Sequence, residues 1–506
     1  MGEAIELRRL IALIAVVALA LLAASQAAPA PPAEPTFGGT QAPEPESAVS
    51  KSSVWYCAWV DSGDVRDSFF GVASDVDVDV TIGLPSPVPN EPPDTFDFDV
   101  VGPGARGIDT SVIVRRGEAP GIVEFDDGPA TAAAVVWADA LATGDRCVVS
   151  VPKLWHLPGG TTRDGAFLSL RLFNPFPENA KVTVNAVSEF GNVPLPELEG
   201  FDVPGRTWTT IDLSQIIPLF DDVGITVSTS QGIVVPSLVL ADSTGEASWP
   251  GTGLSTTWEF PVAVDGGLSP FLALSNTGDV AAEVILDIFT PDGSILDATA
   301  RTVEPGTPLR ISLAEFADPP FGARVRSSVP IAAVVQGTEL AATDADEGDG
   351  EEAPPDAPDA DAGATDEAVT DDGAASSDEA ASDDEAAAAE EPAPPIRGLA
   401  GTVGASEPAR HWLLPAVGLV PETTATIWIM NTGGSAATLT VTPLGDVSDA
   451  PEKVRVEPGA VLGLPVGAPI ATGASAYAVD ATEPVTVAWS LAGVRGVAYV
   501  AGVATE

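Results

Sequence analysis

The chain has 506 residues, 45% of them hydrophobic, and it carries a formal net charge of −51. This length indicates several domains, and the apolar fraction is sufficient to fill their cores. The 22 Lys and Arg residues against 73 Asp and Glu exclude nucleic acid and anionic membrane surfaces as expected partners, because binding to either depends on basic side chains.

The N-terminal segment, residues 1–30, has the order of an export signal. Arg8 and Arg9 precede an apolar run from Leu10 to Ala24, and small residues and prolines follow. This order is typical of a secretory signal peptide, and an uncleaved apolar helix that anchors the chain in a membrane is the alternative. Both alternatives place the rest of the protein outside the cytoplasm, with this segment as its membrane contact. Residues 31–51 are rich in Pro and Ala and are predicted to form a disordered linker.

The first β-sandwich module is predicted over residues 52–154. Its opening strand contains WYCAW, in which Trp55, Cys57 and Trp59 share one face because side chains alternate along a strand. Cys57 and Cys147 are the two cysteines of the chain, and an exported chain is expected to join such a pair in a structural disulfide. A redox or metal-binding role is the alternative interpretation.

The rest of the chain repeats a set of landmarks: a Trp-x-x-Pro, an Asn 18 or 19 residues after the Trp, a strand-like run and a Pro-Gly pair. The recurring residues are Trp155, Pro158 and Asn174, then Trp258, Pro261 and Asn276, then Trp412, Pro415 and Asn431. They predict a second, third and fourth module over residues 155–257, 258–411 and 412–506. In the divergent first module Trp55 leads, and Ala73-Ser74 stands in place of the Asn.

Each module is predicted to be an antiparallel sandwich, because short alternating segments are separated by turn signals every 8–12 residues. In FLSLRLF, residues 167–173, the side chains of Leu168, Leu170 and Leu172 are expected to face the core. The Pro-Gly pairs predict type II turns with Gly at positive φ. The predicted fold class is therefore all-β, with four tandem immunoglobulin-like sandwich modules after an N-terminal apolar helix.

The recurring Trp and Asn residues have structural and functional interpretations. The Asn side chain suits a strand-ending turn, where it bonds to nearby backbone, and a ligand-binding role is the alternative. The Trp ring suits the end of a sandwich core, and a sugar-stacking platform is the alternative. We expect both to be framework residues, because they recur with the repeat.

An acidic run, residues 343–395, contains 20 Asp or Glu and no Lys or Arg. Such a stretch buries too little apolar surface to offset its ordering entropy and is predicted to be disordered. The second module has a hairpin turn at the matching place, so the run is expected to be a loop within the third module. A hydrated spacer, a weak sponge for divalent cations and a solubility device are its candidate roles.

No residues are predicted to be catalytic, cofactor-binding or metal-binding. His156 and His411 lack the partners of a zinc set, and no nucleophile elbow of the Gly-x-Ser-x-Gly type occurs. Asp75, Asp77 and Asp79 match the start of a calcium loop, but Val stands where that loop requires Gly. Their alternation with Val predicts a strand with one solvated face.

The apolar N-terminal segment, WYC at residues 55–57, WHLPGG and LFNP together resemble an uncharacterised actinobacterial family of secreted or membrane-anchored proteins, and the repeats resemble bacterial immunoglobulin-like modules. The resemblance implies export and supplies no catalytic residue. We expect a non-enzymatic structural or binding protein of the cell envelope, as a rod or a cluster of modules. Its expected partner is an envelope polymer or another envelope protein, and the oligomeric state stays open. A glycan-binding protein with grooves between modules and a secreted hydrolase are the alternatives.

Overall fold

The computed structural model describes most of the chain beyond the linker. The described residues are 54–61, 67–110, 117–126, 128–138, 141–263, 268–339, 398–418, 424–445, 451–466, 474–493 and 496–505. The chain divides into two units, Met1–Glu44 and Pro45–Glu506, and the described residues all belong to the second. The predictions for the N-terminal segment, the linker and the acidic run fall on residues outside these ranges.

The described part is nearly all β, as predicted, and its sheets are mostly antiparallel. Two short helical elements interrupt the strands, the 3-10 turn η1 (Pro196–Leu198) and the single-turn helix α3 (Leu213–Ile216). The side chain of Asp212 caps α3 by accepting a hydrogen bond from the amide of Gln215. Among the described residues, no helix has the length and apolar character needed to span a membrane.

The first strand group forms two four-stranded sheets, in the orders β1-β6-β3-β4 and β5-β2-β7-β8. Val78, Val80 and Ile82 of β3 point into the core between the two sheets, because they alternate with exposed or half-exposed polar residues. The strands of this group are β1 (Val54–Asp61), β2 (Asp67–Ser74), β3 (Val78–Leu84), β4 (Asp94–Val100), β5 (Gly104–Asp109), β6 (Glu118–Phe125), β7 (Ala130–Ala138) and β8 (Leu141–Arg146).

The second strand group also forms two sheets, β12-β11-β15-β9 with β13 beside β11, and β14-β10-β16-β17. In β10, Leu168, Leu170 and Leu172 face the core as expected, but Ser169 and Arg171 on the opposite face are buried as well. The strands are β9 (Leu154–Leu157), β10 (Phe167–Asn174), β11 (Ala180–Ser188), β12 (Gly191–Val193), β13 (Phe201–Val203), β14 (Thr207–Asp212), β15 (Val223–Gln231), β16 (Val235–Ala241) and β17 (Glu246–Pro250).

The third strand group is organised around the long strand β23. The N-terminal part of β23 pairs with β18 and β20, and its C-terminal part pairs with β19 and β24, so one strand serves both layers. The strands are β18 (Ser255–Ala263), β19 (Leu268–Asn276), β20 (Ala282–Thr290), β21 (Gly293–Val303), β22 (Thr307–Ser312), β23 (Phe321–Glu339) and β24 (Leu399–Val403).

The fourth strand group repeats this plan around β30, which pairs first with β25 and β27 and then with β26 and β31. The strands are β25 (Ala409–Gly418), β26 (Thr424–Asn431), β27 (Ala437–Leu444), β28 (Glu452–Val456), β29 (Ala460–Pro465), β30 (Ala474–Gly493), β31 (Gly496–Ala501) and β32 (Val503–Ala504). Strand β24 lies parallel to β31 and joins the third and fourth groups in one 15-stranded sheet.

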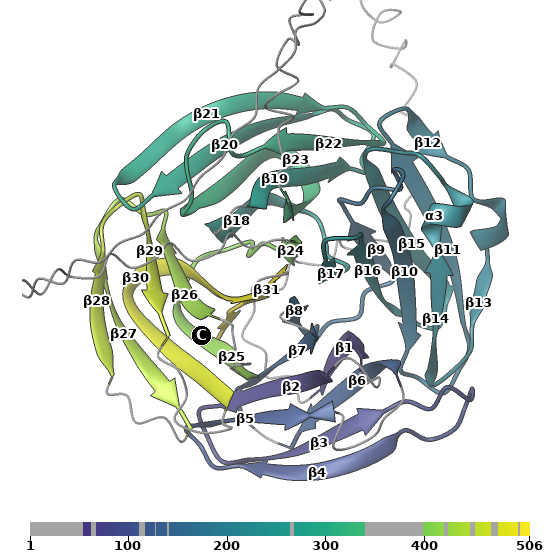
Figure 1. Ribbon diagram of the computed structural model, residues 1–506, viewed down its shortest axis with the longest axis horizontal. Helices are drawn as coiled ribbons and strands as arrows, with labels where there is room; N and C mark the ends of the chain where they lie inside the picture. Colours follow the sequence, from purple (N-terminus) through teal and green to yellow (C-terminus); the bar gives the residue numbers. More distant parts are fainter. Residues whose placement is uncertain are drawn as a thin grey trace, which may run out of the picture. The chain divides into compact units, whose positions relative to one another are not determined.

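The closing strands of the four groups meet one another. Strand β8 contacts β17, β17 contacts β24, β24 contacts β31, and β31 returns to contact β8 (Figure 1). The first and fourth groups are therefore neighbours, although they lie at opposite ends of the described chain. An extended rod, one of the two expected arrangements, would lack the contact between β31 and β8.

The two flanks of the acidic run are adjacent strands of a hairpin. Thr338 near the end of β23 pairs with Leu399 at the start of β24. In the second group, Ala241 pairs with Glu246 across the matching short turn between β16 and β17. The chain therefore leaves and re-enters the sheet at one point.

The Pro-Gly turns differ from the expectation in two copies, since Gly104 of the first copy does not have a positive φ. Gly306 and Gly459 have positive φ values of 68° and 72°, as a type II turn requires, but in the second copy Arg206 has the positive φ, 55°, instead of Gly205. A Cβ atom on Gly205 would lie 2.2 Å from the carbonyl oxygen of Pro177. Glycine is needed there because other backbone passes close to it, and not for its φ angle.

Candidate functional site at the joints between strand groups

The two cysteines form the predicted disulfide. Cys57 in β1 is joined to Cys147, which directly follows β8. Both residues are buried in the core of the first strand group. The bond therefore connects the two sheets of that group.

The recurring tryptophans are buried and bond to the backbone of their own strand groups. Their indole Nε1–H groups donate to the carbonyl oxygens of Val234 (from Trp155, 2.9 Å), Ile331 (from Trp258, 2.8 Å) and Val485 (from Trp412, 2.9 Å). Pro158, Pro261 and Pro415 are buried beside them. The divergent Trp55 is equally buried, but its Nε1 has no hydrogen-bond partner among the described residues.

The recurring asparagines make the same three bonds in each copy. Each side-chain amide donates to two carbonyl oxygens, and each side-chain oxygen accepts from the amide two residues later. The donors are Asn174, to Glu178 and Val203; Asn276, to Val280 and Val303; and Asn431, to Ser435 and Val456. In the first group Ser74 makes two comparable hydrogen bonds. Its hydroxyl group donates to the carbonyl oxygen of Pro129 and accepts from the amide of Val76.

The residue after each tryptophan starts a row of side chains across the sheet. Because strand residues alternate, this row lies on the face opposite the buried indole. The rows, given by cross-strand register, are Tyr56, Ile122 and Gly83; His156, Thr226 and Asn185; Glu259, Arg324 and Asp287; and Leu413, Ala478 and Thr442. The first row is aromatic and apolar, the second polar, the third charged, and the fourth mostly apolar.

The first three rows contact the turn that follows the Asn of the next strand group, and the fourth contacts Ala73, which directly precedes Ser74 in β2 of the first group. We call these contacts joints. The tryptophan-following residues and their partners are Tyr56 with Phe176 (ring centroids 6.0 Å apart), His156 with Thr277 (Nδ1 to Oγ1, 3.3 Å), Glu259 with Thr432 (Oε1 to Oγ1, 2.9 Å), and Leu413 with Ala73 in one apolar cluster. The fourth joint leads back to the first strand group, so the series closes.

Close backbone packing accompanies the joints. A Cβ atom on Gly322 would lie 2.5 Å from Sδ of Met430, and one on Gly224 would lie 3.1 Å from Oγ of Ser275. At the fourth joint a Cβ atom on Gly71 would lie 1.4 Å from the carbonyl oxygen of Ala416. Such a separation is far below van der Waals contact, so this joint requires glycine.

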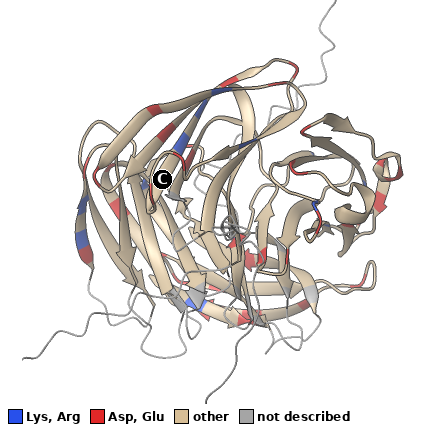
Figure 2. Ribbon diagram, turned by 45° about the horizontal axis from the view of Figure 1, so that its top comes forward, with Lys and Arg blue, Asp and Glu red and all other residues tan. Residues whose placement is uncertain are grey.

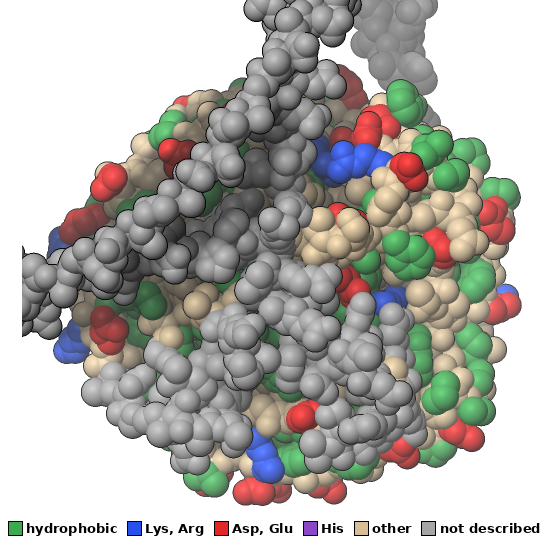
Figure 3. Space-filling view, viewed as in Figure 1, with side chains coloured by type: hydrophobic (Ala, Val, Ile, Leu, Met, Phe, Trp, Pro, Cys, Tyr) green, Lys and Arg blue, Asp and Glu red, His purple; other side chains and the backbone are tan. Residues whose placement is uncertain are grey.

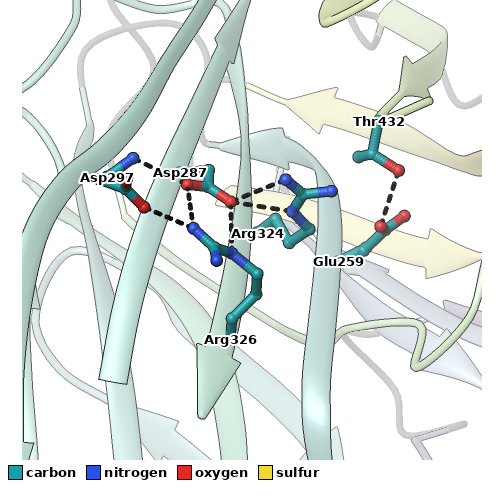
Figure 4. Close-up of polar contacts among 6 residues, drawn as sticks. All are labelled: Glu259, Asp287, Asp297, Arg324, Arg326 and Thr432. Carbon is teal, nitrogen blue, oxygen red and sulfur yellow. Dashed lines mark hydrogen bonds and ion pairs between the residues drawn. The ribbon is translucent and has the colours of Figure 1, made fainter. Parts of the chain in front are cut away.

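The charged row of the third joint is drawn in Figure 4. Asp287 is fully buried and accepts hydrogen bonds from Nε of Arg324 and Nε of Arg326, both at 2.9 Å. Arg326 also contacts Asp297 at 2.6 Å. Burial opposes ionisation of Asp287, but the hydrogen bonds from Arg326, from the amide of Asp297 and from Arg324 outweigh it and hold its pKa below the usual value.

Glu259 lies at the inner end of this row, where the fourth strand group covers it. It is 2% exposed, and its carboxyl group is bonded to the hydroxyl groups of Thr432 and Thr486. Burial raises the pKa of Glu259, while the two hydroxyl groups and the charge of Arg324 oppose that rise. The third joint is therefore built around a buried carboxyl group whose pKa lies above its usual value.

The second joint has the opposite titration behaviour. His156 is 2% exposed, and its Nε2 has no hydrogen-bond partner among the described residues. Burial lowers the pKa of His156 to about 4, because the charged imidazolium is poorly solvated there. This joint therefore favours a neutral imidazole.

A second polar cluster lies where the closing strands meet. Asp145 of β8 accepts hydrogen bonds from the amide of Arg146, at 2.7 Å, and from Oγ1 of Thr402 in β24, at 3.3 Å. Thr143 of β8 and Ser248 of β17 are 3.4 Å apart between their hydroxyl oxygens. Burial raises the pKa of Asp145 to about 7, although the bonds from Arg146 and Thr402 favour the charged form.

Along the described strands and loops, Lys and Arg positions are scattered among Asp and Glu positions (Figure 2). On the face drawn in Figure 3, basic side chains occur in small separate groups. Within the described ranges, no three His, Cys, Asp or Glu residues are placed to hold a metal ion together. The strand predicted from the alternation of Asp75, Asp77 and Asp79 with Val begins only at Val78, so Asp75 and Asp77 lie before β3. The carboxylate of Asp77 accepts a hydrogen bond from the amide of Gly102.

Residues 126–391 match a protein family described as a family of unknown function, DUF5719. The match covers just over half of the chain. The chain belongs to this family. The matched range includes the whole second strand group and the second joint, so both lie within what defines the DUF5719 family. No curated protein matches the chain.

Sequence reasoning found the framework but not the joints. Recurrence identified the tryptophans and asparagines of this DUF5719 member, whereas Tyr56, His156, Glu259 and Leu413 differ from copy to copy and gave no periodic signal. Their position in the sequence could have identified them, since each of these residues directly follows a landmark Trp. Asp145 had no signal, because one carboxylate among 73 acidic residues is inconspicuous.

Proposed function

We propose that the four strand groups are copies of one immunoglobulin-like module, and that the closed assembly is an exported, non-enzymatic scaffold of the cell envelope. The observation that supports this most is the use made of the recurring side chains. Each Asn amide and each recurring Trp indole is bonded to the backbone of its own group. The recurring residues therefore maintain the shape of each strand group, and the variable residues that follow the tryptophans make the contacts between groups.

Export is supported by the disulfide between Cys57 and Cys147, because such bonds persist in oxidising compartments. Fractionation of the producing cells, with detection of the untagged protein in medium, wall, membrane and cytoplasm, tests this part. Recovery in the medium, wall or membrane fraction is expected, and recovery only in the cytoplasm contradicts export.

Binding to the envelope is tested by co-sedimentation of the purified protein with isolated cell wall, with salt and free sugars as competitors. A scaffold that associates with envelope proteins is expected to leave washed, protein-free wall polymer unbound. Saturable binding that free sugars abolish and salt leaves unchanged would favour the glycan-binding alternative, because sugar stacking does not depend on ionic strength. Loss of binding in salt alone would indicate a charged envelope polymer.

The non-enzymatic part of the proposal is tested with a panel of ester, peptide and glycoside substrates. The expected result is no turnover above that of a heat-denatured sample. Turnover abolished by one point mutation would identify a secreted hydrolase and overturn this part.

A further inference from the structure

A small cavity lies against the disulfide, between the first and second strand groups. Its volume is about 30 Å³. The lining residues are Cys57, Trp59, Ala134, Asp145, Arg146, Cys147, Ser237, Ser248, Trp249 and Pro250. A buried water needs roughly 10–15 Å³ of such volume, so the cavity has room for about two water molecules.

Two buried polar atoms of the lining have no hydrogen-bond partner among the described residues: Nε1 of Trp59 and Oγ of Ser237. Trp59 is 6% exposed and Ser237 is 3% exposed, so bulk solvent does not satisfy them. A buried polar group without a partner is unfavourable by about 1–3 kcal/mol. Both atoms belong to residues that line the same cavity, which makes one shared partner sufficient.

The rest of the lining offers further hydrogen-bonding groups. Trp59 offers a donor, Ser237 offers a donor or an acceptor, and the carboxyl group of Asp145 and the hydroxyl group of Ser248 lie on the same walls. A water molecule typically makes about three hydrogen bonds in such a site. The cavity therefore presents enough polar groups for a water in a volume that suits it.

We infer that this cavity is a hydration site, in which ordered water accepts a hydrogen bond from Nε1 of Trp59 and bonds Oγ of Ser237 to the carboxyl group of Asp145. The water connects β1 and β8 of the first strand group to β16 of the second. Because Asp145 also accepts Oγ1 of Thr402, the third group joins the same network. A dry cavity would leave both polar atoms without partners, and a bromide soak tests for an anion, because the lining contains Arg146 as well as Asp145.

The direct test is a crystal structure of the full chain with its disulfide intact, collected natively, after a bromide soak and under xenon pressure. The expected result is a water peak within hydrogen-bond distance of both Trp59 Nε1 and Ser237 Oγ, with no anomalous peak in the cavity. A bromide peak would show that the cavity binds an anion instead of water. A xenon peak or an empty cavity would show that the site is dry. Either outcome overturns the inference.

Variants give an independent solution test. Ser237→Ala removes one partner of the water, and Trp59→Phe keeps a ring but removes the N–H group. Ser169→Ala is the matched control, because Oγ of Ser169 is equally buried and without a partner but does not line the cavity. We expect lower urea midpoints for the two cavity variants and an unchanged or higher midpoint for the control.

Oxidative labelling by hydroxyl radicals distinguishes water loss from general weakening. In the natural protein, water in the cavity should make Trp59 react faster than the similarly buried Trp412, which donates its N–H group to the carbonyl oxygen of Val485 and does not line the cavity. Ser237→Ala should reduce this excess at least twofold. Equal labelling of the two tryptophans in the natural protein would contradict the inference, whatever the outcome of the export and envelope-binding experiments.

Discussion

The third and fourth joints occupy the same place in the fold but are held together by different forces. In the third, Glu259 presents a buried carboxyl group to Thr432 and Thr486 of the next strand group. In the fourth, Leu413 packs in a small apolar cluster with Ala73, and backbone passes close to Gly71. The comparison teaches that a repeated scaffold can keep one contact position while changing its chemistry. The third joint should respond to pH through Glu259, whereas the contact between Leu413 and Ala73 should respond to shape.

Gly71→Val should have the largest effect, since its Cβ would overlap the carbonyl oxygen of Ala416. Backbone cannot move aside as a side-chain rotamer can, so we expect unfolding free energy to fall by more than about 4 kcal/mol, beyond the usual range for overpacking. Urea unfolding with tryptophan fluorescence measures this. Gly434→Val is the control, because no atom lies near that Cβ. Equal stability of both variants would show that the fourth joint is not tightly packed.

Leu413→Ala should weaken the same joint by about 3 kcal/mol, because Leu413 is fully buried and leaves a cavity. The loss should be the same at pH 5 and pH 8, since Leu413 and its cluster partner Ala73 do not titrate. Thermal unfolding at both pH values measures it. A loss that differs clearly between the two would remove the proposed distinction between the joints.

Glu259→Gln should remove the loss of stability that the third joint undergoes as pH rises. The raised pKa of Glu259 means that the folded chain holds a proton at pH values where the unfolded chain has released it. The natural protein therefore loses stability as pH rises through the folded pKa, and below the usual Glu value the loss is absent. We expect Gln to be more stable by about 1–2 kcal/mol at pH 8, the size of one buried polar penalty. Exposed Glu304→Gln is the control, and an equal gain in both variants would refute the assignment.

His156→Gln should change stability with the opposite sign of pH dependence. The pKa of His156 is lowered from 6.5 to about 4, so the unfolded chain binds the proton more readily. Stability is complete above pH 6.5 and is lost as pH falls toward 4. At pH 5 the Gln variant should exceed the natural protein by about 2 kcal/mol, and above pH 7 this gain should disappear. Calorimetry measures the gain, and the half-exposed His411→Gln should not reproduce it.

The sequence predicted the all-β class and the Cys57–Cys147 bond because alternation, turn residues and a single cysteine pair are local or compositional signals. The meeting of β31 with β8 could not be predicted, since it brings together segments with no shared pattern. The second face of β10 shows the same limit. Ser169 and Arg171 alternate with leucines as a solvated face would, but neighbouring strands bury them.

The joints were also beyond a search for recurrence. Repetition reveals what copies share, whereas a contact between unlike neighbours depends on what they do not share. Gly205 illustrates this, because its Pro-Gly context predicted a turn angle and the structure uses the glycine for close approach of Pro177.

The hairpin of β23 and β24 provides a natural splice point. Because Thr338 and Leu399 are register partners, the length of chain between them can change without shifting any strand. The entropy of closing a loop grows only logarithmically with its length, by about 0.6 kcal/mol per doubling. Changes in the length or charge of the segment between these two residues should therefore have little effect on the free energy of unfolding. A reporter domain can be inserted there for the same reason.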